Sequence, residues 1–182
     1  TEASSLFDEL MTTLPFQQHS VIIKGKPVAQ PRLVAWFGDF GYTYSGLHLQ
    51  PHAWGKYPTL NSLKAQVEAV TGHTYNTALC NLYRDCYDSV AWHADDEASL
   101  GLNPIIASLS FGSTRRFQFR YQTNHAVCVC ARSAECTCAA RADYELALHS
   151  GSLLLMAEHV QEAFHHRIPK EYHDRGARIN IT

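Results

Sequence analysis

The sequence predicts one mainly β domain with flanking helices, of the sandwich or jelly-roll type. Its 182 residues are enough for one full hydrophobic core and too few for two independent ones. Helical periodicity is confined to two segments before residue 73, and short β-type runs separated by turn-forming residues follow to the end. About eight or nine strands at this spacing are typical of a sandwich or jelly roll rather than a parallel α/β sheet. With 46% hydrophobic and 18% charged residues, the composition excludes a disordered or fibrous chain.

Two helices are expected before the strands. Ser4 or Ser5 can cap the first helix, whose leucine, methionine and phenylalanine residues form one apolar stripe that ends near Pro15. The second helix is expected from about residue 59 to residue 70, because leucines and valines recur there at helical spacing. Gly72 can then take the left-handed conformation that stops the helix. Both helices are expected to back the core.

The β-type runs follow one another without an internal repeat. We expect residues 1–182 to form a single domain, in which residues 1–73 contain the helices and residues 74–182 form the jelly-roll core. The expected strands cover residues 74–83, 88–93, 104–112, 115–121, 126–130, 143–148, 152–157, 164–169 and 178–182.

Four of the six cysteines fall in one short stretch that is typical of an elaborated hairpin: Cys128, Cys130, Cys136 and Cys138. Each pair can share one face of its strand, so four thiolates could meet around a tetrahedral zinc ion. The alternative is a set of free buried thiols, because Cys-x-Cys pairs are less typical of zinc sites than Cys-x-x-Cys. Protein purified without added zinc, if it contains none, rejects the zinc hypothesis.

Charge and hydropathy restrict the partners. The formal net charge of −2 gives no global attraction to a polyanion, which counts against a protein that coats nucleic acid. No apolar run reaches the roughly 18 to 20 residues that span a bilayer, and the amino terminus lacks a secretory pattern. We therefore expect a monomer without membrane contact, in the nucleus, the cytoplasm or both.

Because the first residue is Thr1 rather than Met, we expect the sequence to be a piece of a longer chain.

Two histidines and an aspartate suggest a metal site. His93 and Asp95 are two residues apart, so on a strand both side chains would project from one face. A second histidine from a distant strand would complete a triad of two imidazoles and one carboxylate, the ligand set of iron(II) oxygenases. His166 is the candidate, but its neighbour His165 would point to the opposite face and only one of them can enter the site. Without such a partner, His93 and Asp95 would be a surface pair.

Polar residues alternate with apolar ones on two further strands. Arg178, Asn180 and Thr182 share one face of the last strand, and Asn81 and Tyr83 show the same alternation earlier in the chain. A buried arginine with hydroxyl and amide neighbours suits the distal carboxylate of 2-oxoglutarate. Either run alone would more often be an edge strand with one solvated face.

Together these residues resemble the AlkB family of nucleic-acid dioxygenases. The matching blocks appear in the family's order and cover most of the chain from about residue 20 to the end. Two segments, residues 79–84 and 169–173, look most like the third animal homologue of the family. The blocks are Pro31-Arg32, Trp36-Phe37-Gly38, Tyr42 to Gly46, Asn81-Leu82-Tyr83, His93 with Asp95 to Glu97, Pro104 to Gly112, His166 to Pro169, and Arg178 with Asn180 and Thr182.

The resemblance implies a double-stranded β-helix fold and oxidative removal of alkyl groups from bases such as 1-methyladenine and 3-methylcytosine in DNA or RNA. Succinate, CO2 and formaldehyde would be the products. It favours His166 over His165, because the family's ligand directly precedes an arginine. In the family, the pattern continues two residues beyond Thr182 to a second arginine for the cosubstrate. The implied ligands are His93, Asp95 and His166 for iron(II), and Asn81, Tyr83, Arg178 and Asn180 for 2-oxoglutarate.

The resemblance implies that residues 1–73 contain the nucleotide-recognition region as well as the helices. A base that leaves its stack needs flat walls in the pocket. Tyr42 and Tyr44 match the family's wall, although two tyrosines at strand spacing are otherwise ordinary packing. Glu97 matches an acid near the target base, where a carboxylate would favour the cationic alkylated base; the alternative is a solvated acid. Candidate phosphate contacts, or else members of a solvated basic face, are Arg32, Arg115, Arg116 and Arg120.

Relatives that act on duplex DNA insert an apolar or aromatic wedge that replaces the flipped base. Counted back without gaps from Pro31-Arg32, Lys24 stands at the wedge position, and lysine is a poor substitute for a stacked base. A one-residue gap would put Ile23 there instead. We therefore expect a preference for single strands.

Two other functions share part of this sequence pattern: an oxygenase acting on a protein or small molecule, and an inactive jelly-roll binding module.

Overall fold

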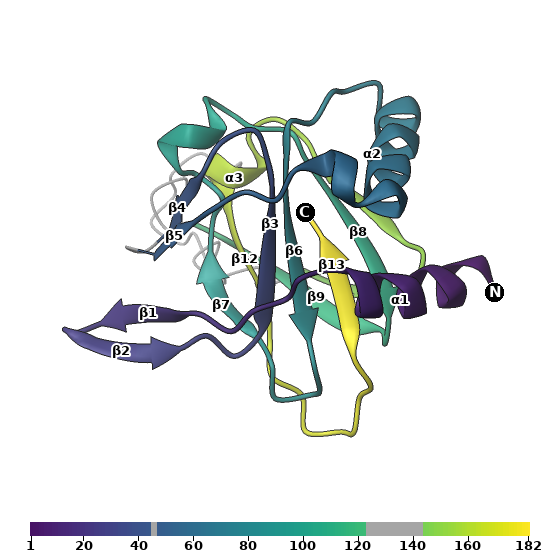
Figure 1. Cartoon of the computed structure of the whole chain (residues 1–182). Helices are drawn as coiled ribbons and strands as arrows, with labels where there is room; N and C mark the ends of the chain where they lie inside the picture. Colours follow the sequence, from purple (N-terminus) through teal and green to yellow (C-terminus); the bar gives the residue numbers. More distant parts are fainter. Residues whose placement is uncertain (45–46, 123–143) are drawn as a thin grey trace, which may run out of the picture.

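Two antiparallel sheets form the body of the protein (Figure 1). The computed structural model describes residues 1–44, 47–122 and 144–182, so the expected strand at 126–130 and the four-cysteine hairpin lie outside the described residues. The major sheet has the order β11 (Leu153–Met156), β8 (Ile106–Gly112), β13 (Arg178–Ile181), β6 (Thr77–Tyr83), β3 (Leu33–Gly38). The minor sheet has the order β10 (Tyr144–Leu148), β9 (Arg115–Tyr121), β12 (Phe164–Ile168), β7 (Val90–His93). The predicted mainly β architecture is confirmed.

The two longer helices pack against the major sheet. Helix α1 spans Glu2–Thr13 and α2 spans Pro58–Thr71. The prediction for α2 is confirmed, including its left-handed end at Gly72 with φ 73°. The predicted cap of α1 is wrong: the hydroxyl of Thr1 accepts a hydrogen bond from the Ser4 N–H at 3.3 Å, so the helix begins before either serine.

The smaller elements connect these layers. Strand β3 pairs with β6 along its whole length, so the major sheet also contains a strand from the segment before residue 74, which the expected strands did not include. Five of the six residues of β3 are buried, and such a strand lacks the alternation that identifies a half-buried one. The remaining elements are the hairpins β1 (Ser20–Ile23) with β2 (Lys26–Ala29) and β4 (Tyr42–Tyr44) with β5 (Leu47–Leu49), and the short helices η1 (Trp54–Lys56), η2 (Ala98–Leu100) and α3 (Val160–Ala163).

Most of the hydrophobic core lies in two layers, and a third, smaller cluster joins β3 to the β4–β5 hairpin. The larger one fills the space between the helices and the outer face of the major sheet, with Leu10 and Leu60 from the helices against Phe37, Leu82 and Ile179 from the strands. The smaller one lies between the two sheets and leaves part of that interior to polar side chains. Because successive residues of a strand face opposite sides, the apolar outer residues determine which polar residues face inward.

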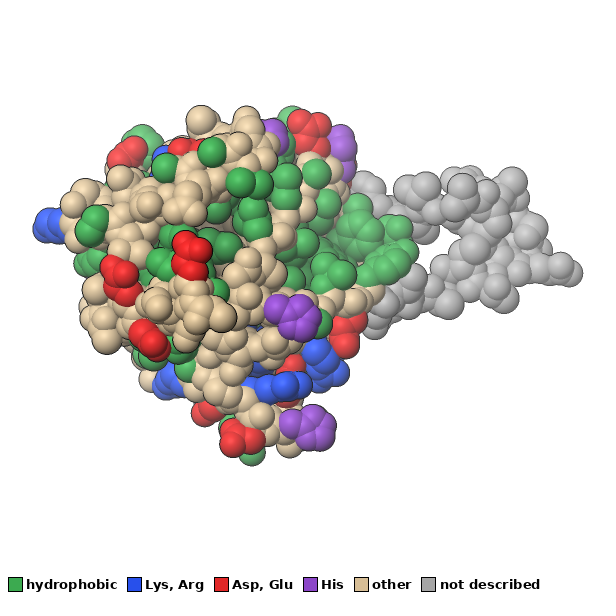
Figure 2. Space-filling view, turned by 90° about the vertical axis from the view of Figure 1, so that its right-hand side faces the viewer, with side chains coloured by type: hydrophobic (Ala, Val, Ile, Leu, Met, Phe, Trp, Pro, Cys, Tyr) green, Lys and Arg blue, Asp and Glu red, His purple; other side chains and the backbone are tan. Residues whose placement is uncertain are grey.

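Not all apolar surface is covered by this packing. Figure 2 shows the face that carries the helices, where hydrophobic side chains gather. A shallow groove there is lined by Leu6 of α1, Val67 and Val70 of α2, and Leu153 of β11. Within the described residues, no helix is both long and apolar enough to cross a membrane.

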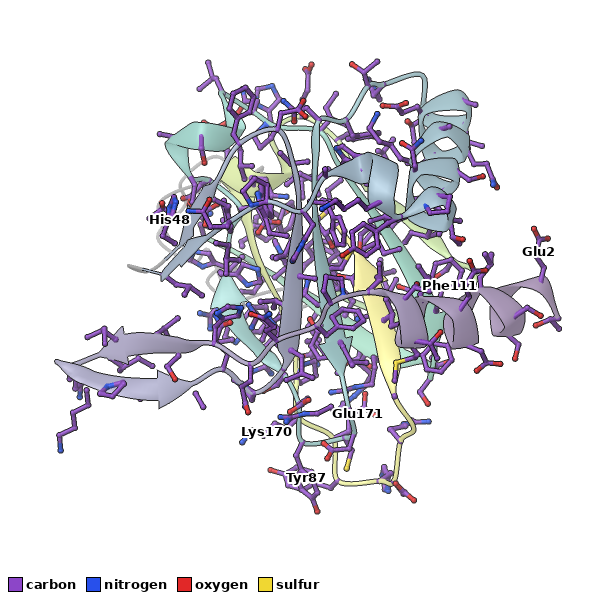
Figure 3. All side chains as sticks on the ribbon, in the orientation of Figure 1. Glu2, His48, Tyr87, Phe111, Lys170 and Glu171 are labelled. Atoms are coloured by element: carbon purple, nitrogen blue, oxygen red, sulfur yellow. The ribbon has the colours of Figure 1, made fainter. Side chains whose placement is uncertain are left out.

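A network of buried charged side chains lies at one end of the two-sheet barrel, at the bottom of Figure 3, which labels Glu171. Arg115 is fully buried and donates to the carbonyl oxygens of Asp85, Asp88 and Pro169 at 2.7–2.9 Å. Its Nε lies 3.6 Å from Glu171, which also accepts from Arg175 at 2.8 Å. The interpretation of Arg115 as a phosphate contact is therefore wrong, because its guanidinium is occupied inside the protein.

Replacing Glu171 by glutamine is expected to lower the free energy of unfolding by about 3 kcal/mol at pH 7, because it leaves the buried charge of Arg115 without its carboxylate. Burial alone would raise the pKa of Glu171, but hydrogen bonds from Arg175 and from the Arg116 N–H lower it. This contribution to stability is therefore complete above about pH 4.3, the unfolded pKa, and is lost as pH falls towards the folded value.

Urea unfolding of both proteins at several pH values measures the effect. Glu145→Gln, at an exposed ion pair with Arg116, is the matched control and should cost less than about 1 kcal/mol. An unchanged difference between wild type and Glu171→Gln down to pH 3 would contradict this account.

Candidate active site

Two histidines and an aspartate converge between the sheets. His93 is the last residue of β7, and His166 stands directly opposite it on β12. The Nε2 atom of each histidine lies 3.5 Å from a different oxygen of Asp95. All three ligand atoms lie within 4.8 Å of one another, close enough to share one metal ion. The predicted convergence is confirmed, but Asp95 lies after the end of β7 rather than on the strand.

Neighbouring groups fix the orientation of these three residues in a way that suits metal binding. The Nδ1 of His93 lies 2.8 Å from the carbonyl of Ala91, which can only accept, so Nδ1 carries the proton and Nε2 is free to bind. His166 is buried and stacks on Phe117, with 5.3 Å between ring centroids. Gln161, a buried residue of α3, accepts a hydrogen bond from the Asp95 N–H at 2.9 Å. Sequence reasoning missed Gln161, which no motif marks.

Two of the three pKa shifts, those of Asp95 and His166, favour the forms that bind metals. Burial alone would raise the pKa of Asp95, but hydrogen bonds with His166 and His93 hold it far below its usual value, so the carboxylate is ionised. Burial lowers the pKa of His166, which favours the neutral imidazole. Burial acts in the same direction on His93, but the hydrogen bond to Asp95, the charge of Asp95 and the hydrogen bond with the Ala91 carbonyl together outweigh it, so the pKa of His93 is raised in the metal-free protein.

The choice between the adjacent histidines is decided by strand alternation. His166 is 3% exposed and faces Asp95, whereas His165 lies on the opposite face of β12, paired with Arg120. His165 is therefore not part of the cluster.

A second group of polar residues lies on the inner face of the major sheet. The register pairs Arg178 with Tyr83 and Asn180 with Asn81, so these four side chains face the same side. Arg178 is 1% exposed and donates from Nη2 to Ser110 at 2.9 Å.

Arg178 is short of partners for a buried guanidinium. Its Nε and Nη1 are buried with no hydrogen-bond partner among the described residues. Burial lowers the pKa of Arg178, and the interactions with Tyr83 that raise it do not offset the effect of burial. A carboxylate of 2-oxoglutarate would supply both the missing acceptors and the opposite charge.

Arg32 interacts with both the polar group on the major sheet and one of the metal-site histidines. Arg32 is buried, and its Nε donates to the Oδ1 of Asn81 at 2.8 Å. Its charge acts on His93, whose pKa it tends to lower. Asn180 donates to the hydroxyl of Ser108 at 2.8 Å. Ser108 and Ser110 were not proposed as site residues, although their alternation along β8 could have indicated them.

The entrance is formed by aromatic and acidic side chains. Tyr42 stacks on Trp36, with centroids 4.4 Å apart, and its hydroxyl donates to Oε1 of Glu97 at 2.9 Å. The Oε2 of Glu97 is buried with no hydrogen-bond partner in the described part of the chain. A cavity of about 660 Å³ reaches Trp36, Tyr42 and Asp95 on this side of the site, and residues of α2 and β6 line much of the rest of it. Tyr44 ends β4, and its side chain lies outside the described residues.

Comparisons with known proteins agree with this arrangement. The model of the 2OG-Fe(II) oxygenase superfamily matches residues 1–182. The chain is 44% identical over 182 residues to the alpha-ketoglutarate-dependent dioxygenase alkB homolog 3 of Bos taurus and 43% identical to that of Homo sapiens, covering 100% of this chain and 60% of each relative. The chain thus spans about 60% of the length of these relatives. It is 34% identical over 186 residues to the DNA oxidative demethylase ALKBH2 of Homo sapiens, covering 100% of this chain and 67% of that protein.

Solved structures show the same fold at low sequence identity. The structure of OsALKBH1 superposes with a TM-score of 0.59 at 13% identity, covering 99% of this chain and 88% of the other. A prolyl hydroxylase of Trichoplax adhaerens, in complex with a peptide fragment, superposes with a TM-score of 0.57 at 10% identity, covering 100% and 78%. The expected double-stranded β-helix is confirmed.

Replacement of His93, Asp95 or His166 by alanine is expected to remove tightly bound iron(II) and abolish turnover with little change in thermal stability. Each change deletes a metal ligand without opening the main core. His165→Ala is the control and should keep iron and substantial activity. Iron retained in His166→Ala but lost in His165→Ala would reverse the assignment.

Arg178→Met is expected to weaken 2-oxoglutarate binding about 100-fold, because a charge-assisted pair of roughly 3 kcal/mol is lost. Calorimetric titration with manganese(II) in place of iron measures the affinity without turnover. Lys170→Met removes an exposed charge at the lower end of the barrel (Figure 3) and should leave the affinity unchanged. Equal affinities of wild type and Arg178→Met would exclude Arg178 from the cosubstrate site.

Proposed function

Because the chain belongs to the 2OG-Fe(II) oxygenase superfamily, we propose that it is an iron(II)- and 2-oxoglutarate-dependent dioxygenase that removes small alkyl groups from bases in single-stranded DNA or RNA. The observation that carries the proposal is the cluster of His93, Asp95 and His166 near a buried, under-partnered arginine, Arg178. Together with oxygen, iron(II) and 2-oxoglutarate supply the oxidation that releases succinate, CO2 and, from a methylated base, formaldehyde.

The residues of the chain position the reactants. Arg178 and Asn180, held by Ser110 and Ser108, would bind and orient 2-oxoglutarate from the major sheet, while Asn81 is held in place by Arg32. Phe117 and Phe119 pack around His166 and exclude water from that side of the metal site. Such fixed positioning is the main contribution that a protein makes when a cofactor carries the chemistry.

The entrance suits a cationic alkylated base. Tyr42 and Trp36 form a stacked aromatic pair beside Glu97, and the hydroxyl of Tyr42 fixes one carboxylate oxygen. The other oxygen, Oε2, is buried without a hydrogen-bond partner among the described residues, and a positively charged base would satisfy it. A carboxylate in this position stabilises 1-methyladenine or 3-methylcytosine, which carry positive charge, more than the neutral repaired base.

The β1–β2 hairpin supports a preference for single strands. Ile23 pairs with Lys26, so Lys24 and Gly25 form a two-residue turn, both with positive φ (49° and 75°). Lys24 thus stands at the tip of a hairpin that projects from the body (Figure 1). A lysine at the tip attracts phosphate but does not replace a stacked base, so the substrate should be one whose unstacking cost is already small.

We further propose that the protein works in the nucleus, the cytoplasm or both.

A coupled turnover assay tests the proposal. With iron(II), 2-oxoglutarate and a single-stranded oligonucleotide containing 1-methyladenine, succinate and the repaired base should form together, and neither should form with the unmodified strand. Succinate release only with a protein or small-molecule substrate would favour another kind of oxygenase, and no succinate release with any substrate would favour a binding module.

The same oligonucleotide annealed to its complement should be repaired at least several-fold more slowly. Lys24→Phe, which places a ring at the hairpin tip, should narrow that difference without affecting the single strand. Equal or faster repair of the duplex by the wild type would show that Lys24 does not determine strand preference.

A further inference from the structure

The outer face of the minor sheet carries a tryptophan between two arginines. The guanidinium carbon of Arg120, on β9, lies 4.4 Å from the centroid of the Trp92 ring, on β7. That of Arg167, on β12, lies 4.3 Å from the same ring. We call these three residues the Trp92 patch. His165 pairs with Arg120 in the register of β12 and β9 and lies on the same face.

Among the described residues, no carboxylate balances the positive charge of this patch. In the described part of the chain, neither Arg120 nor Arg167 forms an ion pair, and Arg167 donates instead to the neutral amide of Gln118 at 2.7 Å. Glu145 is engaged elsewhere, by Gln118 at 2.6 Å and by Arg116 at 3.7 Å. Arg120 and Arg167 are half-buried and lie on the same ring, so their positive charges repel each other. A bound anion would reduce this repulsion.

The Trp92 patch lies directly behind the metal ligands. Trp92 precedes His93 and Arg167 follows His166, and adjacent residues on a strand face opposite sides. Strand β7 is also the edge strand of the minor sheet, and the chain runs on from it to Asp95 and Glu97 at the entrance. A nucleotide whose base enters from this edge would leave its neighbouring phosphates outside the barrel, within reach of the outer face.

We infer that the Trp92 patch binds backbone phosphates of the strand whose base enters the active site, an inference that rests on the proposed function. Planar guanidinium groups match phosphate oxygens with paired hydrogen bonds, and half or more of the hydrogen bonds in protein–nucleic acid complexes go to phosphate and sugar. Trp92 serves as the platform that holds both arginines in place, because each guanidinium packs on the ring rather than sampling solvent.

The variant Arg120→Gln/Arg167→Gln tests this role, because glutamine keeps polar side chains on the ring but removes both charges. Binding of a labelled, unmodified oligothymidylate to the metal- and 2-oxoglutarate-loaded protein is followed by fluorescence anisotropy across a range of salt concentrations. The variant should bind roughly tenfold more weakly at low salt. The slope of log affinity against log salt should become less steep by about 1.4, or about 0.7 for each lost phosphate contact.

Two further variants are controls. Lys56→Ala/Lys170→Ala removes the same two charges from exposed positions on other segments and should leave the slope unchanged. Arg120→Lys/Arg167→Lys restores charge without the planar fork and should recover most of the slope. Thermal melting verifies that all variants are folded.

The outcomes separate this inference from the proposed function. If the wild type binds the strand and the glutamine variant matches it in affinity and slope, the Trp92 patch does not contact phosphate, while the proposed activity stands. A lower melting temperature of that variant with unchanged binding would likewise show that the two arginines only stabilise the sheet. If the wild type binds no oligonucleotide and repairs none, both the inference and the proposed function fail.

Discussion

The antiparallel register of β13 between β6 and β8 is the constraint on which the site depends. Ile179 of β13 is fully buried beneath the helices, so Arg178 and Asn180 on either side of it must face the interior between the sheets. The same register places Tyr83 and Asn81 directly opposite them. If the register of β13 shifted by one residue, Arg178 would face the hydrophobic core and Ile179 would face the site. Hydrophobic burial outside the barrel therefore orients the polar chemistry inside it.

Two buried arginines on this scaffold show how partners distinguish structure from function. Arg115 and Arg178 lie 5.7 Å and 5.3 Å from the same Tyr83 ring. Arg115 donates to three backbone carbonyls and faces Glu171, so its charge is compensated within the protein. Arg178 has one serine hydroxyl partner and two buried nitrogen atoms without a hydrogen bond to any described residue. The first arginine stabilises one end of the two-sheet body, whereas the second lacks partners that a bound carboxylate would supply.

The minor sheet uses its two faces for different tasks. Its inner face presents His93 and His166 to Asp95, and its outer face carries the Trp92 patch on the neighbouring residues. Because β7 lies at the sheet edge, the two faces are separated by one strand at that point. A flexible polymer could thus contact both faces at once, which a small-molecule substrate could not.

The sequence by itself determined the features that depend on local pattern. Helical spacing and Gly72 identified α2, and strand alternation placed Asn81 with Tyr83 and Arg178 with Asn180 on common faces. The resemblance to a known family then favoured His166 over His165, which spacing alone left equivalent, and the structure places His166 beside His93 and Asp95. These features survive in a linear sequence because a periodic pattern records which face of an element is buried.

Only the tertiary structure decided which partners those faces meet. It placed β3 in the major sheet, moved Asp95 off the strand, and buried Arg115, which the sequence suggested as a surface contact. It also brought Gln161 to the Asp95 N–H across 66 residues of sequence. Burial and pairing of this kind arise from contacts between distant segments, and the alternation of a single strand contains no information about them.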